Sequence, residues 1–573
     1  MKKIGIVFLF LLSTINYQLS TAVAAPPHPL IYNTGPLTQE MQALVSQPRI
    51  AVPLMPAEHV VRKAITTGTA KVVAILVEFA DVKASTSHTK AYFDNLLFSQ
   101  ETGYNSLHDY YKEVSDGQLT VTGTTGTRWY KSSKIMSYYG ADGYQTDGLN
   151  TDICNLVIEA VQEADADINF SQYDLDGDGI VNHVIIVHAG YGQEDTDIAT
   201  NIWSHSGSFT VINGNVIDEK GYLTNDGVHV KNYTMMSEYS KVGTFAHEFG
   251  HDLGLPDLYN TQVTRGSTVV GNWDLMDGGS WLGPGQDGSR PAHINAWGKQ
   301  FLGWITPTTL TSQQLAVPVY PGNAQSVYKI PLLTADDRVK EYFLVEYRRK
   351  EYFDSYLPGE GLLFWHIDDA ILDYETYDKY GNTGSAMELN VVNSEPYVPH
   401  RAVDLEEADS TDKTSEASDP FPGTRGITSF VSTNNGAYNN KPSQFSVLNI
   451  NNAVGSYMTF DIYQAVFTKL PDITNVYSYP NPSTTGQAKL KIITTNMVEP
   501  RDIDLKIYDV NGGLIREAKT GEINQVDISD NKVEYEYSWD GRNEAGEKVA
   551  SGVYLFWFKA DNKEKIGKVA IIK

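Results

Sequence analysis

The stretch AHEFGHDLGLPDLYN at residues 246–260 restricts the fold of this chain more than any other part of the sequence. His247 and His251 are four residues apart, so they project from the same face of an α-helix. Gly254 stands where the chain can leave the helix sharply, and Asp257 follows three residues later. The fold must therefore supply a helix whose C-terminal turn lets a carboxylate return to two imidazoles.

Two imidazoles and a returning carboxylate can bind one metal ion. A catalytic zinc takes three protein ligands and keeps one open position, and we expect His247, His251 and Asp257 to be these ligands. Glu248 then lies beside the open position, where it can take a proton from a water whose pKa zinc lowers from about 15.7 to roughly 7. The alternative is a helix that carries the pattern by coincidence, which is far rarer for the extended pattern than for HExxH alone.

A second stretch, GNWDLMDGGSW at residues 271–281, contains Met276 in a predicted turn. In zinc peptidases with an extended motif, a methionine turn passes beneath the metal as an apolar floor. Taken alone, LMDGG indicates only a turn, but its distance after the helix favours the floor. We therefore expect Met276 to be a structural part of the site.

The stretch YDLDGDGIVNHV at residues 173–184 resembles the start of an EF-hand-type calcium loop, in which carboxylates alternate and a glycine makes the bend. The usual glutamate of the twelfth position is replaced by Ile185. The alternative is a solvated acidic turn, but carboxylates this close repel one another unless a cation offsets them. The predicted Ca²⁺ ligands are Asp174, Asp176, Asp178 and Asn182, with Glu194 or Asp195 as candidates to complete the site.

Other polar groups give weaker signals. The acidic stretch 404–419 could bind another cation, but a charged loop explains it equally well. His188, His205 and His366 end or interrupt apolar runs, as core or turn histidines do, so we leave them out of the metal set.

The N-terminus has the pattern of an export signal. Two lysines precede the apolar run IGIVFLFLL, and AVA supplies small residues for cleavage near Ala24 or Ala25. We therefore expect residues 1–25 to be a signal peptide, with a buried N-terminal helix as the alternative. The run is too short to span a membrane, and no later stretch qualifies.

Charge and cysteine usage agree with an exported protein. The net charge of −26 argues against nucleic acid as a partner, because phosphates would be repelled. Cys154 is the one cysteine, which excludes a disulfide within the chain. It lies in the helical pattern TDICNLVIEAVQEAD, so a buried small hydrophobe is favoured over a reactive thiol.

The 573 residues suggest several domains. Residues 69–305 mix buried strands, such as KVVAILVEFAD and HVIIVHAG, with amphipathic helices, which predicts an α/β or α+β domain. Residues 306–466 are β-rich, with strands in EYFLVEYRR and GLLFWHID. Residues 467–573 contain several short alternating strands with Gly/Asn/Asp turns, which is typical of a small sandwich.

Several of these stretches together resemble the immune inhibitor A family of secreted bacterial zinc endopeptidases. The resemblance rests on AHEFGHDLGLPDLYN and GNWDLMDGGSW, on LHDYYKEVSDGQLTVTG and YDLDGDGIVNHVIIVHAGYGQE upstream, and on EYFLVEYRRKEYFDSYLPGEGLLFWHID and VDLEEAD downstream. It covers about residues 26–465. It implies a propeptide at 26–68, a metzincin-like catalytic domain at 69–305 and an appended β-rich region, in an overall α+β chain. It also carries zinc ligation onto His247, His251 and Asp257 and the general base onto Glu248, although GLPD replaces the histidine usual in metzincins.

The predicted propeptide has no cysteine, so a cysteine-switch mechanism of latency is excluded. The sequence VVRKAI offers Arg62 and Lys63 as a cleavage point. The tail resembles the Ig-like C-terminal domains of exported bacterial proteins, through YPNPSTTGQAKLKI, SWDGRNEAGEKVASGVYLFWF and GKVAIIK. Sorting by a secretion apparatus, anchoring at the cell surface and simple spacing all stay open for this domain.

The sequence thus predicts a secreted zinc endopeptidase that acts on proteins or peptides. The alternative is a catalytically silent binding or adhesion protein on a peptidase scaffold, which the presence of Glu248 argues against. A metal-dependent hydrolase of another polymer is a third possibility, without an obvious sugar- or lipid-binding feature to support it.

Overall fold

The computed structural model divides the chain into two compact units, one built from the described residues of Met1–Pro331 and Lys340–Tyr463, the other from those of Leu332–Val339 and Gln464–Lys573. The predicted signal peptide and propeptide lie outside the described residues, except for residues 23–24 and 65–68. None of the helices described is long and apolar enough to cross a membrane. The described residues are 23–24, 65–101, 105–140, 151–209, 211–213, 216–218, 220–263, 267–322, 326–332, 340–379, 382–409, 415–431, 438, 445–451, 456–464, 473–494, 503–519, 522–529, 532–560 and 563–572.

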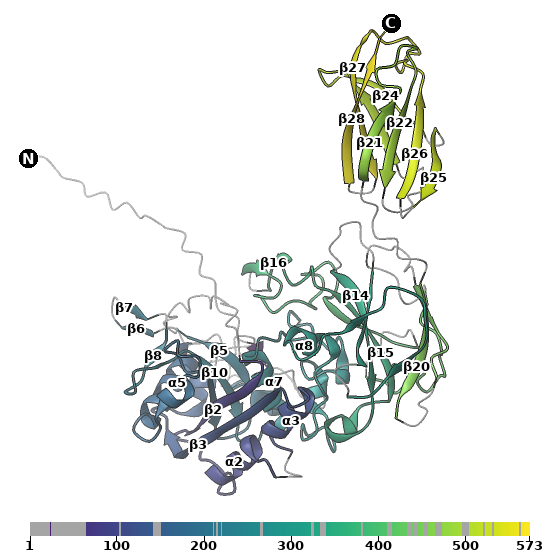
Figure 1. The fold of residues 1–573 in the computed structure, drawn as a ribbon. Helices are drawn as coiled ribbons and strands as arrows, with labels where there is room; N and C mark the ends of the chain where they lie inside the picture. The colour runs from purple at the N-terminus through teal and green to yellow at the C-terminus, as the bar shows by residue number, and fades with distance from the viewer. Residues whose placement is uncertain are drawn as a thin grey trace, which may run out of the picture. The chain divides into compact units, whose positions relative to one another are not determined.

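The first unit contains a six-stranded sheet with the order β1-β5-β10-β4-β2-β3 (Figure 1). Strands β10, β4, β2 and β3 run parallel, whereas β5 is antiparallel to β10 and β1 is antiparallel to β5. The strands are β1 (Val23–Ala24), β2 (Gly68–Glu78), β3 (Leu119–Lys131), β4 (His183–His188), β5 (His205–Ser208) and β10 (Asn232–Ser237). Two small hairpins lie outside this sheet, β6 (Val211–Asn213) with β7 (Val216–Asp218) and β8 (Tyr222–Leu223) with β9 (His229–Val230).

Helices cover both faces of the sheet, which explains why β2 is continuously apolar from Val72 to Val77. Its alternate residues enter two different cores: Val72, Ala74 and Leu76 pack into one, and Val73, Ile75 and Val77 into the other. Helices α2, α3 and α7 lie on the first face, and α5 lies on the second (Figure 1). The helices are α2 (Lys90–Phe98), α3 (Leu107–Val114), α4 (Met136–Gly140), α5 (Thr151–Ala164), α6 (Gln193–Thr196), α7 (Val242–Asp252) and α8 (Ala296–Phe301), with short 3₁₀ turns η1 (Phe170–Tyr173), η2 (Gly271–Trp273), η3 (Gly278–Trp281) and η5 (Tyr352–Tyr356).

Local sequence explains where individual helices begin and what they bury. Ser106 caps α3: its side chain accepts the amide hydrogen of Asp109, and the Asp109 side chain accepts the amide hydrogen of Ser106. This pair of bonds satisfies two backbone N–H groups that have no partner within the first helical turn. On α5, Cys154 is buried in the second core, as predicted, and burial raises the pKa of its thiol to about 12. This thiol is therefore protonated and unreactive at neutral pH.

The rest of the first unit is built from strands. A five-stranded sheet has the order β11-β13-β14-β15-β18, a three-stranded sheet the order β12-β20-β19, and β16 pairs with β17. The hydrophobic core behind α7 continues from residues 70–305 into residues 327–405, so both regions share one core. The strands are β11 (Thr308–Thr309), β12 (Gln314–Val319), β13 (Tyr328–Pro331), β14 (Glu341–Arg348), β15 (Gly361–Asp368), β16 (Glu375–Tyr377), β17 (Thr383–Ser385), β18 (Val403–Glu406), β19 (Phe445–Leu448) and β20 (Met458–Gln464).

The second unit consists of two four-stranded antiparallel sheets, β21-β22-β26-β25 and β24-β23-β27-β28. Inward-facing residues of both sheets form one core, which agrees with the alternating pattern of the tail. The strands are β21 (Ile473–Tyr479), β22 (Ala488–Thr494), β23 (Ile503–Tyr508), β24 (Leu514–Glu517), β25 (Ile523–Ser529), β26 (Lys532–Trp539), β27 (Gly552–Ala560) and β28 (Lys563–Ile571). The described residues are thus mixed α and β with more strand than helix, as predicted; the Ig-like assignment stays a prediction.

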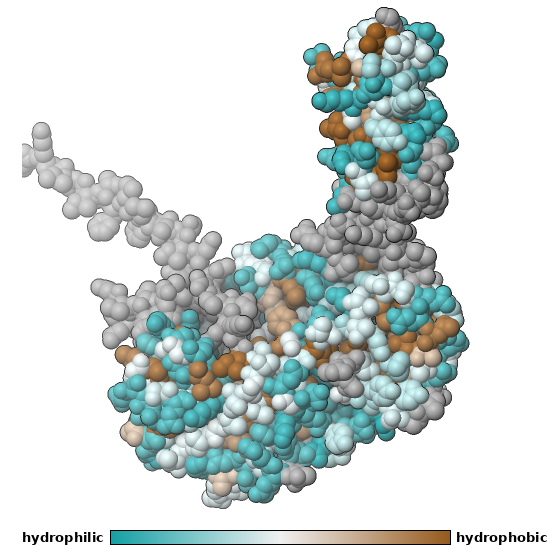
Figure 2. All heavy atoms as spheres, viewed as in Figure 1, coloured by the Kyte–Doolittle hydropathy of each residue, from teal (hydrophilic) through white to brown (hydrophobic). Residues whose placement is uncertain are grey.

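The surface of both units is largely hydrophilic on the face that Figure 2 shows, with hydrophobic residues scattered among charged ones. Individual apolar side chains such as Ile566 and Val553 of the second unit are exposed. Exposed apolar residues of this kind are normal on a protein surface and need no partner.

Candidate metal centre

The imidazoles of His247 and His251, both on helix α7, point toward each other through their Nε2 atoms. The Nδ1–H of His247 donates to the carbonyl of Leu275 over 2.9 Å, and the Nδ1–H of His251 donates to the carbonyl of Leu255 over 2.7 Å. Each of these bonds fixes the tautomer with its hydrogen on Nδ1, so that each Nε2 keeps its lone pair. The two Nε2 atoms lie only 3.1 Å apart, as two ligands of one ion would.

Asp257 completes a triangle with the two imidazoles. Its Oδ1 lies 3.1 Å from Nε2 of His247 and 3.3 Å from Nε2 of His251. Ligands around a tetrahedral zinc with bonds of about 2.0–2.1 Å are separated by about 3.3–3.4 Å. Oδ1 is buried and has no hydrogen-bond partner among the described residues, which is costly unless a cation binds there. The three residues therefore fit a zinc ion.

The electrostatic environment favours the forms of these side chains that bind metal. Burial lowers the pKa of His251, which keeps its imidazole neutral. Burial by itself raises the pKa of Asp257, but the neighbouring His251 and His247 outweigh it and bring this pKa to about 2. Asp257 is therefore ionised over the whole physiological range.

The turn after α7 depends on Gly254, as the sequence predicted. Its φ of 104° lies in a region that side-chain-bearing residues rarely adopt. The amide of Leu255 then bonds back to the carbonyl of Gly250 over 3.0 Å, closing the helix end. This reversal turns the Leu255 carbonyl toward His251 and carries the chain on to Asp257.

Two further side chains at the centre come from very different places in the sequence. Tyr259, two residues after Asp257, is buried and hydrogen-bonds to the Asp257 carboxylate. Burial raises the pKa of the Tyr259 hydroxyl well above its ordinary value, and the charges of Asp257 and Glu248 add to this effect. Asn390, 133 residues downstream, donates from Nδ2 to Asp257 Oδ2 over 2.6 Å. Glu248, the predicted general base, is completely buried on the same helix.

The turn that contains Met276 packs against α7. A Cβ atom added at Gly250 would lie 2.8 Å from the Met276 sulfur, so glycine is what allows this close approach. The turn also supplies the Leu275 carbonyl for His247 and, through the Met276 carbonyl, an acceptor for the Leu258 amide over 2.9 Å. It therefore contacts both the helix and the segment that carries Asp257.

Two buried aspartates shape this turn. Asp274 accepts hydrogen bonds from the amides of Met276 and Asn295, each over 2.6 Å. Asp277 accepts bonds from four backbone amides, those of Val269, Val270, Gly271 and Gly278. Burial raises the pKa of Asp274 to about 6 and that of Asp277 to about 7. The sequence analysis missed both residues, although their positions on either side of Leu275 and Met276 were visible in GNWDLMDGGSW.

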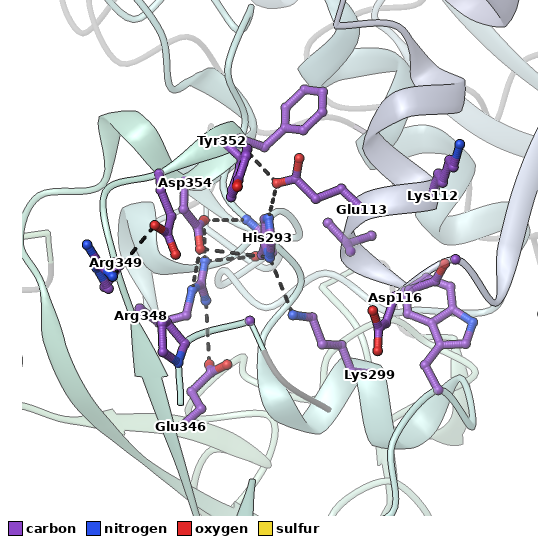
Figure 3. Close-up of a pocket in the computed structure, with 18 of the residues that line it drawn as sticks. Lys112, Glu113, Asp116, His293, Lys299, Glu346, Arg348, Arg349, Tyr352 and Asp354 are labelled. Carbon is purple, nitrogen blue, oxygen red and sulfur yellow. Dashed lines mark hydrogen bonds and ion pairs between the residues drawn. The ribbon is translucent and has the colours of Figure 1, made fainter. Parts of the chain in front are cut away.

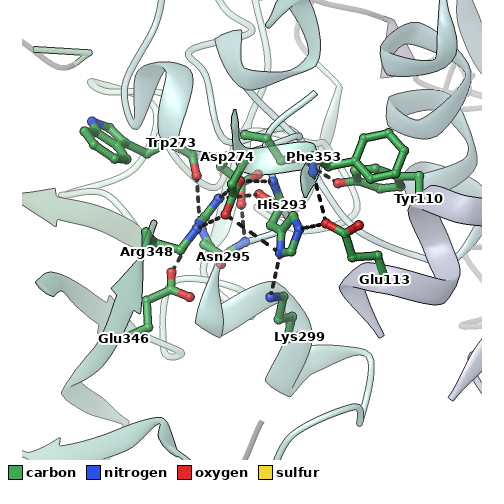
Figure 4. A network of polar contacts seen from close by, with 12 residues as sticks. Tyr110, Glu113, Trp273, Asp274, His293, Asn295, Lys299, Glu346, Arg348 and Phe353 are labelled. Atoms are coloured by element: carbon green, nitrogen blue, oxygen red, sulfur yellow. Dashed lines mark hydrogen bonds and ion pairs between the residues drawn. The ribbon is translucent and has the colours of Figure 1, made fainter. Parts of the chain in front are cut away.

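A polar network from β14 holds the same turn from behind (Figure 4). Arg348 donates to the Trp273 carbonyl over 3.1 Å and makes two bonds of 2.7 and 2.6 Å to Asp354. His293 lies beside this pair and bonds to Glu113 of α3 over 2.7 Å. No pattern in the sequence pointed to these residues, because they are brought together from four separate segments.

A pocket of about 900 Å³ adjoins this network (Figure 3). In the view of Figure 3, Glu113, His293, Lys299 and Arg348 converge, while Lys112 and Asp116 lie farther away. Its lining includes residues of α3, α8 and β14 but none of the metal-binding residues. The pocket is thus separate from the candidate metal centre, and cations and anions are nearly balanced along its walls.

The predicted calcium loop is only partly assembled. The carboxylates of Asp174, Asp176 and Asp178 come within 4.8 Å of one another. Asn182 instead uses its side-chain oxygen to accept the Leu175 amide hydrogen, and Glu194 is buried and bonded to Ser204. Burial, and then the charge of Asp195, raise the pKa of Glu194 to about 8. Calcium at this loop therefore stays a prediction that rests on the three aspartates.

The histidines left out of the metal set have other partners. His188 bonds to the carbonyl of Ala189, and His205 to Tyr233 and the carbonyl of Trp203. His366 lies between Glu341 and Glu406. Among the described residues, the two groups His247–His251–Asp257 and Asp174–Asp176–Asp178 meet the spacing of a metal site. The acidic stretch 404–419 gives no such group where it is described.

The edge of the large sheet next to α7 accepts an extended chain. Strand β5 pairs with β10 on one side and with the two residues of β1 on the other, in the register Val23↔Ser206 and Ala24↔His205. Both β1 and β5 contact α7. An antiparallel peptide can thus lie along β5 beside the helix that carries the imidazoles.

Comparisons with known proteins agree with this geometry. Residues 60–305 match the family model described as immune inhibitor A peptidase M6, catalytic domain. The pre-pro-metalloprotease PrtV of Vibrio cholerae serotype O1 is 32% identical over 296 residues, which are 43% of this chain and 32% of the relative. Immune inhibitor A of Bacillus thuringiensis subsp. alesti is 30% identical over 273 residues, which are 40% of this chain and 39% of the relative.

These matches span less than half the length of either relative. The crystal structure of OgpA from Akkermansia muciniphila covers 92% of this chain and 96% of its own, but with a TM-score of 0.18 and 10% identity, values too low to support a conclusion. Residues 60–305 therefore match the catalytic domain of the immune inhibitor A peptidase M6 family, as the resemblance of the motifs predicted.

Proposed function

We propose that this protein is a secreted zinc-dependent endopeptidase with Glu248 as its general base. The observation that supports this most directly is the triangle of His247 Nε2, His251 Nε2 and Asp257 Oδ1, whose sides of 3.1, 3.1 and 3.3 Å match zinc coordination. The M6 family and the metalloprotease name of one relative support a metal-dependent peptidase.

Bound zinc would supply a Lewis acid for the scissile carbonyl and lower the pKa of an attacking water. The side chains around it have separate tasks. Glu248 takes the proton of the attacking water and delivers it to the leaving amine. Met276 forms the floor under the imidazoles, and its turn holds His247 in the required tautomer through the Leu275 carbonyl.

A peptide substrate is expected to bind as an added strand. The pairing of β1 with β5 supports this, since it satisfies the backbone groups of an extended segment at the edge next to α7. Main-chain bonding of this kind is independent of sequence, so specificity must come from the side-chain pockets beside the strand.

The remaining assignments complete the proposal. We infer export through a signal peptide at 1–25, latency through a propeptide at 26–68, and a metzincin-like arrangement at 69–305. Residues 306–466 form the β-rich region and 467–573 the Ig-like domain, for which sorting by a secretion apparatus, anchoring at the cell surface and spacing all stay open. A structural Ca²⁺ at Asp174, Asp176 and Asp178 is part of the same proposal, supported by their mutual distances.

The test is the variant Glu248→Gln, which keeps the shape of the side chain but cannot accept the proton. We expect it to bind zinc like the wild type while its kcat on casein falls by about 100- to 10,000-fold. Glu101→Gln, at an exposed glutamate of the same unit, is the matched control and should keep full activity. A chelator should abolish wild-type activity, and added zinc should restore it.

Two results would contradict the proposal. If Glu248→Gln hydrolysed casein at the wild-type rate, Glu248 could not be the general base. Purified protein that takes up zinc but shows no chelator-sensitive cleavage of any member of a peptide library would favour a silent binding protein on a peptidase scaffold.

A further inference from the structure

We propose that Asn390 is a positioning residue for the metal: it holds one oxygen of Asp257 so that the other faces the two imidazoles. The inference rests on the metal site proposed above and concerns a residue far outside the catalytic motif. Asn390 lies 133 residues after Asp257 in the sequence, in the loop between β17 and β18.

The side chain of Asn390 makes two hydrogen bonds to Asp257. Its Nδ2 donates to Asp257 Oδ2 over 2.6 Å, and its Oδ1 accepts the backbone amide hydrogen of Asp257 over 2.8 Å. One amide side chain thus fixes both the backbone and the carboxylate of the same residue. This leaves Oδ1 of Asp257 as the oxygen without a hydrogen-bond partner among the described residues, and it is the atom that approaches both Nε2 atoms.

Asparagine suits this position for two physical reasons. The backbone of Asn390 has a φ of 52°, a left-handed conformation that asparagine adopts more readily than most residues. Its side chain also combines a donor and an acceptor, which the carboxylate and the amide hydrogen of Asp257 require together. An aspartate would keep the acceptor but would place a second negative charge against Oδ2.

Asn390 is itself held firmly. It is 7% exposed, and its carbonyl accepts a hydrogen bond from Thr261 Oγ1 over 2.8 Å. The amide of Asn390 bonds to the carbonyl of Met387 over 3.2 Å. The segment that follows α7 and the loop that carries Asn390 are therefore locked together, and the β-rich part of the unit contributes directly to the metal centre.

A carboxylate that is held in this way binds metal through one oxygen in a fixed direction. Without the bond from Asn390, the carboxylate of Asp257 is left with the hydrogen bond to Tyr259 and is held less firmly, so ordering it on metal binding costs affinity. Removing partners that orient metal ligands typically reduces metal affinity by about 10- to 100-fold. The effect should appear in zinc binding itself, before any catalytic step.

The experiment compares Asn390→Gly with a matched control in the same loop. Glycine tolerates the left-handed backbone, so the variant loses the two contacts without added strain. The control is Asn393→Ala. Asn393 is 1% exposed, and its side chain bonds to the Leu258 carbonyl and to Ala402 and Val403 rather than to the Asp257 carboxylate. Both variants lose buried hydrogen bonds, but only Asn390→Gly loses the hydrogen bond to the Asp257 carboxylate.

Zinc affinity of the full chain is measured by competition with a chromophoric chelator, and stability of the metal-free protein by urea unfolding. We expect Asn390→Gly to bind zinc about 10- to 100-fold more weakly, while Asn393→Ala keeps an affinity within a few-fold of the wild type at a similar loss of stability. The visible absorption of the cobalt-substituted protein should change in Asn390→Gly alone, because the coordination of the carboxylate changes.

An unchanged zinc affinity in Asn390→Gly, or equal losses in both variants, would overturn the inference. If the glycine variant does not fold, Asn390→Ser replaces it, since the serine hydroxyl is one bond shorter than the asparagine amide and loses the contact with Oδ2. Failure of the proposed function looks different: the wild type would then bind no zinc, or would bind it without hydrolysing peptides.

Discussion

At the scale of single residues, the candidate centre depends on carbonyl groups as much as on its ligands. The carbonyls of Leu275 and Leu255 fix which nitrogen of each imidazole carries the hydrogen. A histidine without such a bond could present an N–H to the metal instead of a lone pair. The peptide chain around α7 is therefore part of the coordination chemistry.

Arg348 allows a test of how the turn of Met276 is supported. In the wild type, the charge of Arg348 outweighs the effect of burial and helps to hold the pKa of Asp354 at about 2. Arg348→Met leaves the Asp354 carboxylate buried without this cation, so burial then disfavours its charged form. We expect a loss of about 3–5 kcal/mol in the free energy of unfolding, measured by urea denaturation. The double variant Arg348→Met/Asp354→Leu should recover part of this loss, because it removes the stranded carboxylate.

The neighbouring Arg349 provides the control. It is about a third exposed and lies 3.8 Å from Glu351, a surface pair whose contribution is expected to be below about 1 kcal/mol. Arg349→Met should therefore change the free energy of unfolding only slightly. Equal losses in the two single variants would show that burial of the Arg348–Asp354 pair is not what supports the turn.

At the scale of elements, the five-stranded sheet contains a buried charged group that makes its stability depend on pH. His366 of β15 lies between Glu341 of β14 and Glu406 of β18, at 3.0 and 3.1 Å. Burial lowers the pKa of His366, but the hydrogen bonds and charges of the two glutamates outweigh it and raise this pKa to about 9. The imidazolium thus bridges three strands at neutral pH.

The sign of the effect follows from linkage. The folded protein holds this proton more tightly than the unfolded chain, whose histidines titrate near 6.5, so the contribution is complete below about pH 6.5 and disappears as the pH rises through about 9. The shift corresponds to about 3 kcal/mol. We expect the difference in unfolding free energy between wild type and His366→Gln to shrink by about this amount from pH 6.5 to 9.5.

The measurement is urea unfolding of both proteins across this pH range. Taking the difference between them removes the titration of the other histidines, provided that the variant leaves those groups in place. A difference that stays constant from pH 6.5 to 9.5 would show that His366 is not charged in the folded protein.

At the scale of the whole molecule, the position of the hydrophobic cores predicts which parts of the chain can be removed. The core of the second unit uses residues 473–571 alone. The core behind α7 uses residues on both sides of position 305, and so do Asp257 with Asn390 and Trp273 with Arg348. The metal centre therefore needs residues 306–463 but not the second unit.

Two truncated chains test this expectation. A chain that ends at Tyr463 should keep the zinc affinity and the unfolding midpoint of the first unit. A chain that ends at Ile305 should lose both, because it exposes apolar core residues and removes the partner of Asp257. The measurements are zinc competition and thermal unfolding; a stable, zinc-binding fragment that ends at Ile305 would contradict the shared core.

The sequence predicted those elements whose pattern is complete within a short window. The strand in the run at 71–81 and the helix with His247 and His251 were found because a continuous apolar run and an i, i+4 spacing are local signals. The sharp turn at Gly254 was found for the same reason. The arrangement of the parallel strands, with helices on both faces, could not be predicted in detail, since strand order depends on pairing between distant segments.

The sequence by itself thus determined which side chains could bind a metal, because their spacing on one helix and one turn dictates where they point. Tertiary structure decided what orients Asp257 and what supports the turn of Met276. Asn390 contacts Asp257 across 133 residues, and Arg348 contacts the Trp273 carbonyl across 75. A hydrogen bond depends on where two atoms lie in space, and for residues this far apart only the packing of the shared core determines that distance.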